Sequence, residues 1–67
     1  MIKRSLRLAG HATSLALEPE FWAALDRRAA AENVPLPVLL ARLDAGRGES
    51  SLASACRVAA LGWAAEP

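Results

Sequence analysis

Cationic side chains near the start of the chain are the residues best placed to do chemistry. Lys3, Arg4 and Arg7 all precede Glu18, the first acidic residue. A guanidinium group can donate two hydrogen bonds to guanine, and an ammonium or guanidinium group can neutralise a phosphate. This segment therefore predicts contact with nucleic acid. The competing interpretation is that these charges only keep an exposed strand soluble.

Groups suited to catalysis or to metal binding are scarce. His11 and Cys56 each occur once, which is too few for a zinc site that needs several ligands in fixed geometry. The sequence contains no recognisable set of nucleophile, histidine and acid, and Gly46 and Gly48 lack the spacing of a phosphate-binding loop. We therefore expect no enzymatic activity, no metal and no cofactor.

Length and composition indicate one small domain, residues 1–67, whose core is completed by a second copy. Of the 67 residues, 54% are hydrophobic but only 4% are aromatic, and the net charge is +1. A chain of this length buries only about 60% of its unfolded surface, and one cysteine cannot form an internal disulfide. No uncharged apolar run reaches the roughly 18 residues of a membrane span, and an unpaired cysteine suits a reducing compartment. We therefore expect a cytoplasmic homo-oligomer.

Alternating hydrophobicity predicts one β-strand ahead of the helices. Leucines occupy even positions before Gly10 and odd positions after it. A bulge at this glycine would return both sets of leucines to one face. We therefore expect an extended segment over residues 4–17, most regular over residues 11–17. No later strand follows to pair with its backbone groups, so the partner strand should come from another chain.

Helical periodicity follows, with breaks that separate three helices. Pro19, flanked by glutamates, is typical of a helix start, because proline suits the first turn and acids suit the positive end of the dipole. Pro35 disfavours helical geometry in the residue before it. Ser50 or Ser51 can cap a third helix after a glycine-rich turn. The predicted helices therefore cover residues 19–33, 36–45 and 51–64.

Apolar positions at helical spacing mark the candidate core. The clearest stripe lies in the second helix, where leucines recur at the i, i+3, i+4, i+7 spacing. The predicted dimer core comprises Leu15, Leu17, Trp22, Leu25, Leu36, Leu39, Leu40 and Leu43. The third helix is apolar nearly all round, which is typical of a helix that is presented to another subunit. Assembly beyond a dimer could therefore use Leu52, Val58, Leu61 and Trp63.

Two segments resemble a known family. Residues 10–22 match the opening G-H-x-T-S-x-x-L-E-P-E-F-W of a group of short bacterial ribbon-helix-helix proteins, and residues 52–57 resemble the L-x-S-A-x-R start of their third helix. The resemblance implies a mainly α fold with one β-strand, in which two chains pair their strands into an antiparallel ribbon over interlocked helices. It also implies a homodimeric DNA-binding regulator related to the Arc and MetJ repressors.

In this family, strand side chains that point away from the core read the DNA. On the predicted strand these positions hold two alanines and one serine, and only Ser14 can hydrogen-bond a base edge. The cations and Ser5 of the opening segment join that face if the bulge restores the register. The candidate DNA-binding residues are therefore Lys3, Arg4, Ser5, Arg7, Ala12, Ser14 and Ala16.

Two functions stay open at this point. The strand motif and the cationic opening favour a transcriptional regulator that binds duplex DNA. The alternative is an oligomerisation or protein-interaction module that keeps the fold with little or no sequence-specific DNA binding. Ala12 and Ala16, together with the apolar third helix, favour the alternative.

Overall fold

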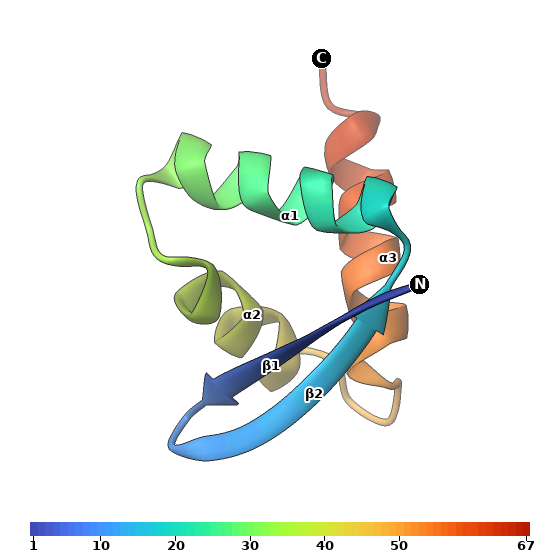
Figure 1. Cartoon of the computed structure of the whole chain (residues 1–67). Helices are drawn as coiled ribbons and strands as arrows, with labels where there is room; N and C mark the ends of the chain where they lie inside the picture. Colours follow the sequence, from blue (N-terminus) through green and yellow to red (C-terminus); the bar gives the residue numbers. More distant parts are fainter.

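The segment ahead of the helices folds back on itself as a β-hairpin. In the computed structural model, which describes all 67 residues, β1 (Ile2–Leu8) and β2 (His11–Leu17) form a two-stranded antiparallel sheet (Figure 1). The turn residues Ala9 and Gly10 have φ angles of 51° and 84°. Two consecutive positive φ angles are typical of a type I′ turn, whose twist matches that of paired strands.

The hairpin corrects the prediction of one strand with a bulge at Gly10, whereas pairing of β2 with a strand of another chain stays a prediction. Even-numbered residues of β1 lie opposite odd-numbered residues of β2, as Leu6 lies opposite Thr13. Opposite residues share a face of the sheet, so the change of parity marks a turn rather than a bulge. β1 therefore supplies, within the chain, the strand partner that β2 needs.

Three helices follow the hairpin, and their predicted bounds are confirmed to within one residue. α1 spans Pro19–Glu32, α2 spans Leu36–Ala45 and α3 spans Leu52–Ala64. α1 ends where Asn33 adopts the left-handed conformation with a φ of 59°. α3 begins after Ser51, whose hydroxyl oxygen accepts a hydrogen bond of 3.0 Å from the backbone three residues on. Local capping chemistry therefore sets these boundaries.

The core lies between the hairpin and the helices. All three helices lie on one side of the hairpin, with α2 against β1 and α3 against β2 (Figure 1). The buried cluster comprises Leu8, Leu15, Leu17, Trp22, Leu25, Ala29, Leu39, Leu40 and Cys56. Leu36 and Leu43 are half-buried and pack against this cluster. Every residue predicted for a dimer core thus packs within one chain, and a role between two copies stays a prediction.

Cys56 is the one titratable side chain of this core. It is fully buried, and burial raises the pKa of its thiol from 9.0 to about 11 because desolvation disfavours the thiolate. At neutral pH it therefore behaves as a small apolar side chain.

α3 has one buried side and one exposed side. Leu52 and Trp63 pack against the core, whereas the side chains of Val58 and Leu61 lie in solvent with exposed fractions of 67% and 72%. Of the four residues predicted for further assembly, two therefore pack within the chain and two have side chains that are exposed to solvent. No helix of the structure combines the length and the apolar character needed to cross a bilayer.

Candidate nucleic-acid interface

The hairpin presents one face to the helices and the other to solvent. Alternation along the two strands places six of the seven candidate DNA-binding residues on the solvent side, which we call the outer face of the hairpin. These residues pair across the strands as Lys3 with Ala16, Ser5 with Ser14, and Arg7 with Ala12. The structure thus brings together residues from two strands that the sequence separates, and their contact with DNA stays a prediction.

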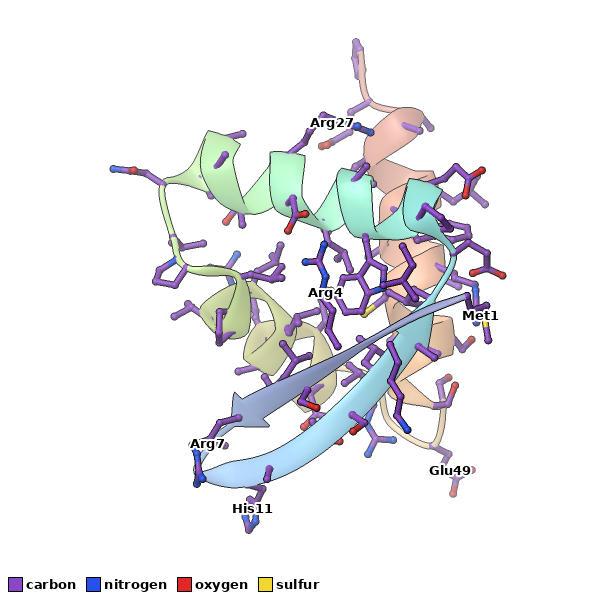
Figure 2. All side chains as sticks on the ribbon, in the orientation of Figure 1. Met1, Arg4, Arg7, His11, Arg27 and Glu49 are labelled. Carbon is purple, nitrogen blue, oxygen red and sulfur yellow. The ribbon has the colours of Figure 1, made fainter.

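Arg4, the seventh candidate, lies on the opposite face. Its two Nη atoms each donate a hydrogen bond of 3.2 Å to a carboxylate oxygen of Asp26, and its guanidinium lies 4.3 Å from the centre of the Trp22 ring. The side chain points from β1 toward α1, between the hairpin and the helices (Figure 2). Arg4 therefore joins the hairpin to α1 and is separated from the other cations of its strand.

Trp22 reinforces the same junction. Its indole Nε1 donates a hydrogen bond of 2.8 Å to the backbone carbonyl of Ile2, while its ring is 2% exposed. Trp22 is among the predicted core residues, whereas its hydrogen bond to β1 and the pairing of Asp26 with Arg4 were not predicted. The acid is distant in sequence from Arg4 and belongs to a helix that only the folded chain brings to β1.

The ion pairs divide the cations of the chain into two classes. Arginines 4, 28, 42, 47 and 57 each contact a carboxylate within 3.2 Å. Lys3, Arg7 and Arg27 form no ion pair, although Arg7 donates a hydrogen bond of 3.2 Å to the carbonyl of Gly10. Arg7 lies near the tip of the hairpin and Arg27 on the far side of α1 (Figure 2). Two of the three unpaired cations thus lie on the outer face of the hairpin.

Small side chains occupy the rest of this face. Ser5 and Ser14 lie opposite each other at its centre, and the remaining β2 positions are alanines. Short side chains let the backbone approach a surface closely but offer few hydrogen bonds to base edges. The arrangement is therefore suited to strong attraction to phosphates, with limited direct discrimination between bases.

Comparison with known proteins places this arrangement in a family. The family model described as "Ribbon-helix-helix domain" matches residues 1–64, which include the hairpin and all three helices. Searches of curated proteins and of solved structures find no match. Because the family match spans nearly the whole chain, the protein belongs to the ribbon-helix-helix domain family.

Proposed function

We propose that this protein is a homodimeric DNA-binding protein that regulates transcription and contacts duplex DNA through the outer face of its hairpin. Ribbon-helix-helix domains typically dimerise and serve as DNA-binding regulators. The observation that carries the proposal is the pair of unneutralised cations, Lys3 and Arg7, on a face that holds no acid. DNA phosphates could therefore pair with Lys3 and Arg7 without displacing a carboxylate of the protein.

The shape of the hairpin supports the same conclusion. A two-stranded ribbon has the width that the major groove of B-DNA admits. Lys3 and Arg7 stand at opposite ends of β1, about 13 Å apart at the usual rise of a strand. The small residues between them allow the strands to lie close to the base edges. Affinity should therefore come mainly from phosphate contacts, with Ser5 and Ser14 as the side chains able to hydrogen-bond bases.

Fluorescence anisotropy of a labelled duplex, titrated at two salt concentrations, tests this proposal. Each phosphate contact contributes about 0.9 to the slope of log affinity against log salt. Lys3→Ala combined with Arg7→Ala should lower both the affinity and this slope. Arg27→Ala is the matched control, because it removes an equally unpaired cation from α1. The control removes one charge and the double variant removes two, so a control loss half as large as that of the double variant, on a logarithmic scale, would mean that only net charge matters and would refute an interface on the hairpin.

A second candidate function rests on α3. Val58 and Leu61 lie one helical turn apart and are 67% and 72% exposed, which favours an oligomerisation or protein-interaction module. Sedimentation of Leu61→Glu and Val58→Glu tests it, with Ala31→Glu as a control at an exposed position of α1. If neither apolar substitution reduces assembly while the protein stays folded, this candidate loses its support.

A further inference from the structure

A hollow lies between α1 and α3, away from the hairpin. It has a volume of about 280 Å³, near the lower end of the range for small-molecule sites. Three alanines leave the space open because their side chains are short, and the other lining residues are two arginines and one tryptophan. The complete set is Ala24, Arg27, Arg28, Ala60, Trp63 and Ala64. The hollow therefore combines apolar surface with positive charge, and no acid lines it.

Arg27 brings to this hollow a charge that the chain does not neutralise. The residues three and four positions away from it in both directions along α1 are all alanines, so no acid lies at the spacing that pairs charges on a helix. Its guanidinium forms no ion pair and no hydrogen bond within the chain. Figure 2 shows this side chain on the side of α1 away from the hairpin. All of its N–H donors are therefore available to an anion.

Arg28, the second arginine of the hollow, is held in place but keeps a free donor. Its Nε donates a hydrogen bond of 2.7 Å to Glu32, and its Nη1 donates one of 2.8 Å to Glu66. The guanidinium lies 5.1 Å from the centre of the Trp63 ring. Its Nη2 has no partner within the chain. Because two carboxylates and a ring already fix this group, binding an anion through Nη2 costs little conformational entropy.

Glu66 shows that a carboxylate can be recognised at this hollow. It follows the end of α3, and its carboxylate contacts Arg28, whose guanidinium lies beside the Trp63 ring. The side chain of Glu66 is 51% exposed, so water weakens the ion pair. An anion that contacts both arginines and also buries apolar surface can therefore displace Glu66 from Arg28.

We propose that the hollow between α1 and α3 binds a small organic anion, whose acidic group contacts Arg27 and Arg28 and whose apolar part lies on the alanines beside Trp63. This goes beyond the proposed function and does not depend on it, because no residue of the hollow belongs to the outer face of the hairpin. Carboxylates and phosphate esters form the same charge-assisted hydrogen bonds with guanidinium groups, so both classes share this chemistry. Glu66 acts as an internal competitor for Arg28.

NMR of the two indole N–H groups of the chain tests the site. Benzoate or phenyl phosphate should shift the Trp63 signal saturably, with a Kd on the order of 1 mM for ligands of this size, and their relative affinities identify the preferred acid. The Trp22 signal should not move, because its N–H is bound to the carbonyl of Ile2. Benzamide, which is neutral, should bind at least about 10-fold more weakly than benzoate. Absence of a saturable Trp63 shift with both anions, or equal binding of benzamide and benzoate, would overturn the proposal.

Charge substitutions give an independent test with the same titration. Arg27→Ala should weaken benzoate binding at least about 10-fold, whereas Arg7→Ala, which removes an equally unpaired cation from the hairpin, should not. Glu66→Gln should strengthen binding several-fold, because it removes a negative charge and the competitor for Arg28. Circular dichroism checks that each variant is folded. Equal effects of Arg27→Ala and Arg7→Ala, or weaker binding in Glu66→Gln, would contradict the proposal.

DNA binding is measured separately, so that the two proposals can fail independently. Lys3→Ala combined with Arg7→Ala should lower the affinity for a duplex and leave benzoate binding unchanged. A protein that binds benzoate at Trp63 but shows no affinity for DNA would refute the proposed function and leave the anion site standing. A duplex that shifts the Trp63 signal and competes with benzoate would show that the hollow is a DNA contact, and would overturn the anion site.

Discussion

The two faces of the hairpin place the same kind of side chain in opposite environments. On the inner face, Arg4 is bound to Asp26 and lies against the Trp22 ring. On the outer face, Lys3 and Arg7 have no carboxylate partner. A cationic segment that looks uniform in sequence therefore contains one cation that stabilises the fold and two whose charge is free for a ligand. Substitutions on the inner face should therefore lower the free energy of unfolding, and substitutions on the outer face should weaken DNA binding.

The largest contrast is expected at Trp22. Trp22→Ala removes a buried ring, the hydrogen bond to Ile2 and the surface on which Arg4 lies. Loss of a buried aromatic side chain should lower the free energy of unfolding by about 3–5 kcal/mol. Ser5→Ala, on the outer face, should change it by less than about 0.5 kcal/mol. Urea unfolding compares the two, and similar losses would show that the faces do not differ as described.

Arginine substitutions on β1 sharpen the comparison. Arg4→Ala should lower the free energy of unfolding by about 1 kcal/mol, because it removes a half-exposed ion pair and a cation–π contact. It should leave the salt dependence of DNA binding nearly unchanged. Arg7→Ala should do the reverse, with near-normal stability and weaker binding. If Arg4→Ala reduced the salt dependence as much as Arg7→Ala does, the division between the two faces would be wrong.

Acid should act on the ion pairs of the helices rather than on the outer face. Glu32 contacts Arg42 at 2.6 Å and Arg28 at 2.7 Å, and these hydrogen bonds hold the pKa of Glu32 below its ordinary value of 4.5. A lowered pKa stabilises the folded chain above that ordinary value, and the stabilisation disappears as the pH falls through the folded-state pKa.

Glu32→Gln should therefore make the urea midpoint less sensitive to pH on the acid side. Glu20, which forms no ion pair, provides the matched control as Glu20→Gln. The measurement is the urea midpoint between about pH 6 and about pH 3. An unchanged acid response in Glu32→Gln would remove Glu32 from the account of acid stability.

The smallest effect is expected within the outer face itself. Ser5 and Ser14 are the outer-face side chains able to hydrogen-bond bases, so Ser5→Ala and Ser14→Ala should alter the preference among duplex sequences, whereas Arg27→Ala should not. A single serine hydrogen bond is worth about 1 kcal/mol, so the change in preference should be several-fold. A library of labelled duplexes measures it, and an unchanged preference in both serine variants would exclude the serines from base contact.

Short-range chemistry explains what could be predicted in advance. Helix boundaries depend on residues next to them, such as Pro19, Asn33 and Ser51, so the bounds of all three helices were accessible. Alternation likewise predicted which side chains share a face. The prediction of a single strand was wrong because type I′ turns usually have residues that favour positive φ, such as Asn-Gly, at both central positions. In the pair Ala9–Gly10 only the glycine is such a residue.

The sequence alone determined the three helices, the alternating faces of the extended segment and its excess of positive charge, because each depends on neighbouring residues. Tertiary structure decided the rest. Folding sets β1 against β2 and pairs Arg4 with Asp26, and so decides which cations are neutralised. Such pairings depend on the register of a turn and on the packing of a distant helix, and both arise only when apolar burial brings remote segments together.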